Sequence, residues 1–205
     1  MLLIMKSKIF GKYSQAQAAS LVEERFRGAI IDAGNKFGVD PHLIAAILVD
    51  EISRIDLWDR LQDGVARRVI AAQGRRQRNL IKVWQLLCRE EIGTQSFGLA
   101  QMNVNSLKDL IRKGLVELPE GSHPHCIEGV LGMLEDVDLV PMLVGAQIRY
   151  TIDHWGQADV DISDRPEICG TLYSIGLSGS RGVHAHPEPN PRGSQIAEMA
   201  RKLKI

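Results

Sequence analysis

Two adjacent acids, Asp50 and Glu51, follow the uninterrupted apolar run of residues 43–49. A helix that is apolar on every side is usually buried, so this run predicts a core helix that ends in two carboxyl groups. Burial of a carboxylate is costly and raises the pKa of the acid toward neutral pH. Such an acid can protonate the oxygen of a breaking glycosidic bond. Helical spacing does not choose between the two acids, and a simple pairing of one of them with Arg54 is the structural alternative.

The acids need elements that hold them, and the sequence predicts helices. Residues 15–37 carry apolar side chains at helical spacing and end at Gly38, after which Asp40 and Pro41 are typical of a new helix start. Neither a strand run nor an internal repeat is evident, so the predicted class is all-α. Further helices are predicted over residues 55–72, 77–91, 97–113, 126–137, 140–155, 167–175 and 194–203.

Length and composition fit one domain. The chain has 205 residues, of which 44% are hydrophobic and 24% charged, and these values are ordinary for a globular protein. We therefore predict a single domain over residues 1–205, with an N-terminal helix at 14–37 and an added, arginine-rich helical insertion lobe at 54–92. The formal net charge is zero, which gives no support to nucleic-acid binding through a basic surface.

The N-terminal segment MLLIMKSKIF begins apolar, but Lys6 and Lys8 interrupt the run early. A secretory signal needs a basic start, an unbroken apolar stretch and a small-residue cleavage site, and this order is absent. No later segment approaches the roughly 20 apolar residues of a membrane span. The sequence therefore predicts neither a standard export signal nor a membrane span.

Histidines and cysteines offer an interpretation from a different class, a metal-dependent hydrolase. Their spacing matches no standard ligand motif, and no HExxH occurs, so we predict no metal and no cofactor. The cysteines form no CxxC pair, and a bridge between Cys126 and Cys169 stays open, with Cys88 as the odd thiol. The residues that would form a zinc site if their segments met are His123, His125, Cys126, His154, His184 and His186.

Three segments, in order along the chain, resemble the motifs of one enzyme family. DPHLIAAILVDEIS, which contains Glu51, resembles the catalytic helix of lytic transglycosylases and goose-type lysozymes. SFGLAQMN resembles the GLMQ segment of these enzymes, with Ala100 in place of Met, and TLYSIG resembles their AAYNAG segment, with Ser174 in place of Asn. The resemblance covers residues 38–205. It implies a lysozyme-like helical domain with a buried central catalytic helix and Glu51 as its catalytic acid.

The resemblance also implies a substrate and the residues that hold it. The substrate would be the glycan strand of peptidoglycan, cut at the β-1,4 bond between N-acetylmuramic acid and N-acetylglucosamine. Gly98 would let the backbone approach a sugar, and Gln101 would offer an amide donor and acceptor to the glycan. The expected substrate-binding residues are Ser96, Gly98, Gln101, Asn103 and Tyr173.

The type of cleavage depends on a second carboxylate. In lytic transglycosylases one Glu suffices, whereas in goose-type lysozymes extra aspartates help a water molecule to attack. The aspartate that ends the lysozyme motif corresponds here to Asn103, which cannot act as a base, so the resemblance favours a lytic transglycosylase. Glu91 is the candidate second acid, with a solvated helix-end charge as the alternative. A hydrolytic muramidase and a catalytically inactive glycan-binding module are the other open interpretations.

Peptidoglycan lies in the periplasm or cell wall, outside the cytoplasm. Without a standard signal, the enzyme would reach it through a dedicated secretion system, during phage lysis, or as a mature fragment whose signal has been removed. An injected antibacterial effector would also imply an immunity or inhibitor protein that plugs the cleft.

Overall fold

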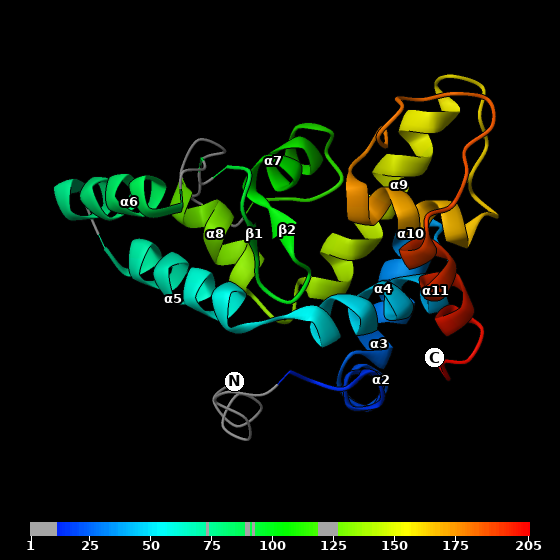
Figure 1. Ribbon diagram of the computed structural model, residues 1–205, viewed down its shortest axis with the longest axis horizontal. Helices are drawn as coiled ribbons and strands as arrows, with labels where there is room; N and C mark the ends of the chain where they lie inside the picture. The colour runs from blue at the N-terminus through cyan, green and yellow to red at the C-terminus, as the bar shows by residue number, and fades with distance from the viewer. Residues whose placement is uncertain (1–11, 73, 89–90, 92, 119–126) are drawn as a thin grey trace.

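The computed structural model describes residues 12–72, 74–88, 91, 93–118 and 127–205, and their regular secondary structure is helical apart from one short hairpin (Figure 1). The prediction of an all-α class is therefore confirmed. None of the described helices combines the length and the apolar content that a membrane span requires. The described elements are α2 (Gln15–Arg25), α3 (Arg27–Phe37), α4 (Pro41–Arg54), α5 (Leu57–Ala71), α6 (Gly74–Cys88), β1 (Ser96–Phe97), β2 (Met102–Asn103), α7 (Val104–Arg112), α8 (Ile127–Glu135), α9 (Val140–Gly156), α10 (Pro166–Ile175) and α11 (Pro191–Ala200).

Helix α4 lies at the centre of the fold, with α2, α3, α9, α10 and α11 packed against it. Asp40 begins the helix by accepting a hydrogen bond from the His42 amide at 2.9 Å, and Pro41 occupies the first turn. Every residue from Leu43 to Ile52 is buried, as the all-round apolar pattern predicts. The helix therefore carries the two acids at its C-terminal end into the interior.

The predicted helix over residues 15–37 is divided at Phe26 into α2 and α3. A capping box of Ser14 and Gln17 begins α2, and Gly38, with a φ of 61°, ends α3. Phe26 is buried, and the break gives the two halves different neighbours: α2 packs on α4, whereas α3 packs on both α4 and α9. One straight helix could not follow both surfaces, and helical spacing in the sequence does not reveal this constraint.

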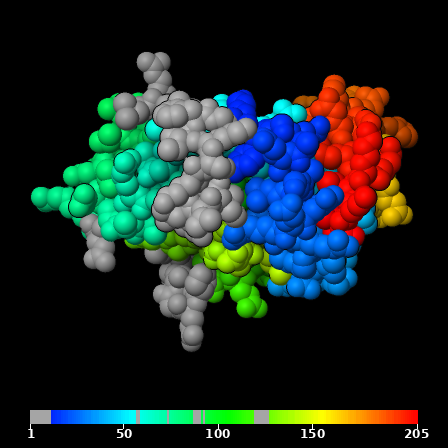
Figure 2. Space-filling view, turned by 90° about the horizontal axis from the view of Figure 1, so that it is seen from below, coloured from blue at the N-terminus to red at the C-terminus, as the bar shows by residue number. Residues whose placement is uncertain are grey.

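Helices α5 and α6 form a lobe at one end of the molecule (Figure 1), within the region predicted as a helical insertion. Helix α5 packs against α6, α8 and β1. Seen from below, α2 and α3, in blue, lie between this lobe and α11, in red (Figure 2). The lobe is in direct contact with the hairpin, because α5 packs on β1.

The first part of the predicted helix over residues 97–113 is instead the β1–β2 hairpin, and α7 begins only after it. The turn of the hairpin contains two positive φ angles, 68° at Gly98 and 46° at Gln101, which a right-handed helix does not allow. Asn103 then caps α7 by accepting a hydrogen bond from the Ser106 amide at 2.8 Å. The prediction was wrong here because the apolar spacing of the sequence continues through the turn, whereas the helical conformation of the backbone does not.

Glycine at position 193 allows helices α10 and α11 to pack closely. Asn190 caps α11, and its side chain accepts a hydrogen bond from the Gly193 amide at 2.7 Å. A Cβ atom on Gly193 would lie 2.1 Å from Oγ1 of Thr171 and 2.2 Å from the carbonyl oxygen of Glu167. This position therefore accepts no side chain, and α11 begins at Pro191, earlier than predicted.

We expect Gly193→Ala to lower the free energy of unfolding by roughly 2–3 kcal/mol, because the added methyl group overlaps atoms of α10. Gly132→Ala is the matched control, since Gly132 is also helical and a Cβ there meets nothing within 4 Å. The control should gain about 0.5–1 kcal/mol from helix propensity. Urea unfolding of both variants measures the difference, and equal stabilities would contradict the assigned packing.

Candidate active site

A cleft of about 430 Å³ opens where the end of α4 meets the hairpin, α7, α9, α10 and the start of α11. Its lining comes from stretches that are far apart in the sequence, and most of the lining side chains are polar. The structure brings together there five of the residues that the sequence singled out: Glu51, Ser96, Gln101, Asn103 and Tyr173.

Glu51 lies in the wall of this cleft with only 7% of its surface exposed. Nη2 of Arg192 is 2.8 Å from its Oε1 atom. Burial raises the pKa of Glu51 to about 7, and the attraction of Arg192 opposes this rise while the charge of Asp50 adds to it. The carboxyl group is therefore poised to give or take a proton near neutral pH.

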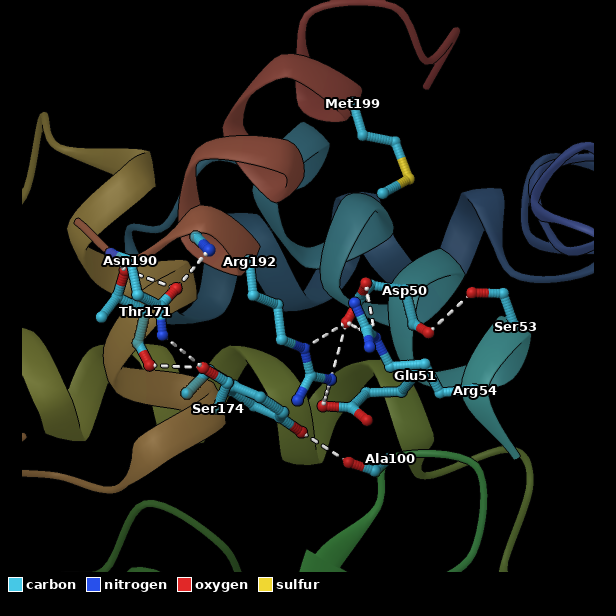
Figure 3. Close-up of polar contacts among 12 residues, drawn as sticks. Asp50, Glu51, Ser53, Arg54, Ala100, Thr171, Ser174, Asn190, Arg192 and Met199 are labelled. Carbon is cyan, nitrogen blue, oxygen red and sulfur yellow. Dashed lines mark hydrogen bonds and ion pairs between the residues drawn. The ribbon is translucent and has the colours of Figure 1, made fainter. Parts of the chain in front are cut away.

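Asp50 is held differently, although it is the next residue on the same helix. Nη2 and Nε of Arg192 lie 2.6 and 2.7 Å from its Oδ2 atom, and Nε of Arg54 donates at 3.0 Å. Figure 3 shows Arg192 reaching from α11 toward both acids, with Arg54 beside Asp50. Asp50 is absent from the described lining of the cleft. Two guanidinium groups thus bind Asp50, and Glu51 is the acid that faces the cleft.

The start of α11 sets the position of Arg192. Pro191 occupies the first turn, and Asn190 caps the helix while its backbone amide donates to Oγ1 of Thr171 at 3.0 Å. These contacts join α11 to α10, and Figure 3 shows the Arg192 side chain lying between them and the two acids. Sequence analysis did not identify Arg192. The available signal was charge balance, because two buried acids need two cations and Arg54 supplies only one of them.

Tyr173 links the α10 wall of the cleft to the hairpin. Its hydroxyl group donates to the carbonyl oxygen of Ala100 at 2.8 Å. Burial raises the pKa of Tyr173 well above its usual value, and the nearby charge of Glu51 raises it further. On the hairpin, Nε2 of Gln101 donates to the carbonyl oxygen of Gly98 at 3.0 Å. The phenol therefore stays neutral beside Glu51 and helps to fix the opposite wall.

Helices α7 and α9 supply cleft residues that the sequence analysis missed. Ser106 and Asp109 come from α7, and Asp109 forms an ion pair with Arg112. Gln147 and Tyr150 come from α9, and Oε1 of Gln147 is buried with no hydrogen-bond partner among the described residues. These residues lie far along the chain from the three motifs, so the sequence offered no reason to select them.

Glu91 and Gly98, two of the expected site residues, are absent from the described lining of this cleft. Glu91 is exposed, and its carbonyl oxygen accepts hydrogen bonds from Thr94. A Cβ atom on Gly98 would lie 1.9 Å from the carbonyl oxygen of Leu134, so the hairpin needs glycine there for packing against α8. The positive φ and this close approach explain Gly98 without a sugar.

Among the described residues, no group of three or more histidine, cysteine or acidic side chains is arranged to hold a metal ion. His123, His125 and Cys126 lie outside the described residues, whereas Cys169, the other half of the possible bridge, is a free thiol. The thiol of Cys169 is buried and donates to the carbonyl oxygen of Ile162 at 3.3 Å, and burial raises its pKa to about 12. This thiol is therefore an inert part of the core.

Comparisons with protein-family models, with curated proteins and with solved structures find no match to this chain. The geometry and chemistry of the cleft therefore provide the basis for assigning a function.

We expect Arg192→Gln to raise the pKa of Glu51 above about 7, because the guanidinium group that favours the carboxylate is lost. Carbon-13 NMR of the Glu51 carboxyl group measures this shift. Arg181→Gln is the control, since Arg181 pairs only with the exposed Glu188 in the described structure. An unchanged or lower pKa in Arg192→Gln would contradict the observed ion pair.

The raised pKa of Glu51 also predicts a pH dependence of stability. The folded protein keeps the proton up to a pKa of about 7, whereas the unfolded chain loses it near 4.5, so stability falls as pH rises through this interval. The slope is about 1.4 kcal/mol per pH unit from this group. Wild type should therefore lose stability relative to Glu51→Gln between these pH values, as measured by urea unfolding. The exposed Glu188→Gln should follow the wild type.

Proposed function

We propose that this protein cleaves the β-1,4 bond between N-acetylmuramic acid and N-acetylglucosamine in peptidoglycan, with Glu51 as general acid and base in a lysozyme-like helical domain. One observation carries the proposal. A buried carboxyl group with a pKa of about 7 lies in the wall of a polar cleft, beside residues from the other two motifs. A general acid is most effective when its pKa lies near the working pH.

The proposed reaction uses one carboxyl group twice. Protonated Glu51 gives its proton to the glycosidic oxygen, and the bond from this oxygen to the muramoyl C1 atom breaks. The 6-hydroxyl oxygen of the muramoyl residue then bonds to C1, and its proton returns to the Glu51 carboxylate. The product carries a 1,6-anhydro ring, no water is consumed, and the enzyme ends in its starting state. Arg192, 2.8 Å from Glu51, stabilises the carboxylate between the two proton transfers.

The polar lining suits a saccharide. Hydroxyl and amide side chains can exchange hydrogen bonds with sugar hydroxyl and acetamido groups from several directions. Residues of this kind in the cleft are Ser96, Gln101, Asn103, Ser106, Gln147, Tyr150, Tyr173 and Ser174.

A hydrolytic muramidase is the second candidate, and it is favoured by the presence of a second carboxyl group, that of Asp109, in the cleft lining. Inverting hydrolysis needs a second carboxylate about 6.5–9.5 Å from the acid, with room for water between them. Asp109 is the other carboxylate in the described lining, and it is already engaged in an ion pair with Arg112. We therefore favour the transglycosylase reaction.

Peptidoglycan lies outside the cytoplasm, so the proposal includes delivery to the periplasm or cell wall by a dedicated secretion system or during phage lysis. For an injected antibacterial effector, it also includes an immunity or inhibitor protein that occupies the cleft. The delivery route and the inhibitor protein both depend on the proposed substrate.

We expect Glu51→Gln to reduce muropeptide release from purified sacculi by at least about 1,000-fold, because the amide cannot give a proton to the leaving oxygen. Mass spectrometry of the wild-type digest should find 1,6-anhydromuramoyl ends. Reducing ends that have gained water would instead identify the muramidase.

Asp109→Asn is the matched control, since it removes the other carboxylate of the described cleft lining. We expect it to keep the anhydro product and most of the activity. Retained activity in Glu51→Gln, with its fold intact by circular dichroism, would exclude Glu51 as the catalytic acid. A strong loss in Asp109→Asn together with hydrated ends would establish the hydrolytic mechanism.

A further inference from the structure

A second buried pair of carboxyl groups lies behind the hairpin, outside the cleft. Asp63 comes from the middle of α5 and Glu135 from the end of α8, and a hydrogen bond joins their side chains. The exposed fraction is 8% for Asp63 and 11% for the side chain of Glu135. Both line a largely apolar cavity of about 100 Å³ between α2, α4, α5, the hairpin and the end of α8.

These two groups share one proton. Two carboxyl groups in hydrogen-bond contact inside a protein are not both ionised at neutral pH, because their charges repel strongly at low dielectric and the second ionisation is displaced to higher pH. The Gly98 amide donates to Oδ1 of Asp63 at 3.0 Å and so favours the charged form of Asp63. Burial and the charge of Asp63 raise the pKa of Glu135 to about 8. Glu135 therefore holds the proton at neutral pH.

The charged groups around the pair shift the pKa values of the two acids. Arg67 on α5 is 3.6 Å from Oε2 of Glu135 and favours its charged form, whereas Asp59, also on α5, raises the pKa of Asp63. The other titratable or charged residues that line the cavity are Tyr13, Arg25 and Arg60.

Hydrogen bonds run from this pair to the cleft. Gly98, whose amide is bound by Asp63, accepts through its carbonyl oxygen from the backbone and side-chain nitrogens of Gln101, at 3.2 and 3.0 Å. Ala100, in the same turn, accepts from Tyr173 beside Glu51. Both Gln101 and Tyr173 line the cleft. One side of the turn thus contacts α5 and α8, and its other side forms the cleft wall.

A direct catalytic role does not fit this pair. The two carboxyl groups of a glycosidase stand at least about 5 Å apart, so that a sugar or a water molecule fits between them. Asp63 and Glu135 are bonded to each other instead, and their contacts lead to the backbone of the turn.

We propose that Asp63 and Glu135 are positioning residues whose single shared proton holds the turn over residues 98–101 in place as the cleft wall, and that loss of this proton moves the turn. With both groups ionised, Asp63 is repelled by Glu135 and its bond to the Gly98 amide is strained. The cleft then loses its arrangement of Gln101 and of the Ala100 carbonyl group. The alkaline limit of ligand binding is thus set by a group outside the cleft.

Nitrogen-15 NMR of the full chain tests the coupling without any ligand. We use Glu51→Gln as the background, so that the titration of Glu51 is absent. The amide signals of Gly98 and Gln101 should shift together between about pH 6 and pH 9.5, with one midpoint near 8, and both shifts should vanish when Glu135→Gln is added. A shift at Gly98 without one at Gln101, or none at Gly98, would overturn the proposal.

Asp63→Asn in the same background provides a second test should Glu135→Gln fail to fold. Asparagine can still accept from the Gly98 amide and can donate to an ionised Glu135, so the midpoint near pH 8 should disappear. Persistence of that midpoint in Asp63→Asn would assign the titration to another group and overturn the proposal.

A binding experiment tests the consequence for the cleft, and this part rests on the proposed function. The affinity of a tetramer of N-acetylglucosamine should fall about tenfold from pH 6 to pH 9.5 in Glu51→Gln and change less than about twofold with Glu135→Gln added. Equal losses in both proteins would overturn the positioning role. Absence of binding at every pH would contradict the proposed function, and the NMR titration then decides the inference by itself.

Discussion

The cleft depends on how the chain accommodates two successive carboxyl groups at the C-terminal end of a buried helix. Burial disfavours their charges, and the partial negative charge of a helix C-terminus disfavours them further. Arg54 comes from the same helix and Arg192 from α11, so two guanidinium groups oppose two acids. Both guanidinium groups contact Asp50, whereas Glu51 contacts Arg192 and has a raised pKa. The closing helix is thus bound to the central helix by charge as well as by apolar packing.

This arrangement explains why the cleft has walls from distant parts of the chain. Arg192 needs α11 at a fixed position, and Asn190, Gly193 and Thr171 hold α11 tightly on α10. Helix α10 in turn presents Tyr173 to the hairpin. Each contact positions the next, so that Glu51 faces a polar cleft rather than the apolar core that surrounds the rest of its helix.

The protein contains two pairs of neighbouring carboxyl groups whose members have different surroundings. In each place specific donors bind one acid, and burial raises the pKa of the other. Asp50 and Glu51 differ through guanidinium contacts, and Asp63 and Glu135 differ through the Gly98 amide. The first pair lies at the cleft wall, and the second lies behind the hairpin that forms the opposite wall. Both pairs therefore bear on one site from two sides.

The sequence by itself determined the helical class, the start and complete burial of α4, and the presence of an acid there with a perturbed pKa, because local spacing and composition encode these features. It also selected seven site residues, and five of them line the cleft. Only the tertiary structure showed that Glu51 lines the cleft while Asp50 binds two guanidinium groups, identified Arg192, replaced a predicted helix by the hairpin, and joined Asp63 to Glu135. These outcomes depend on contacts between residues far apart in the chain, where packing and charge pairing override local pattern.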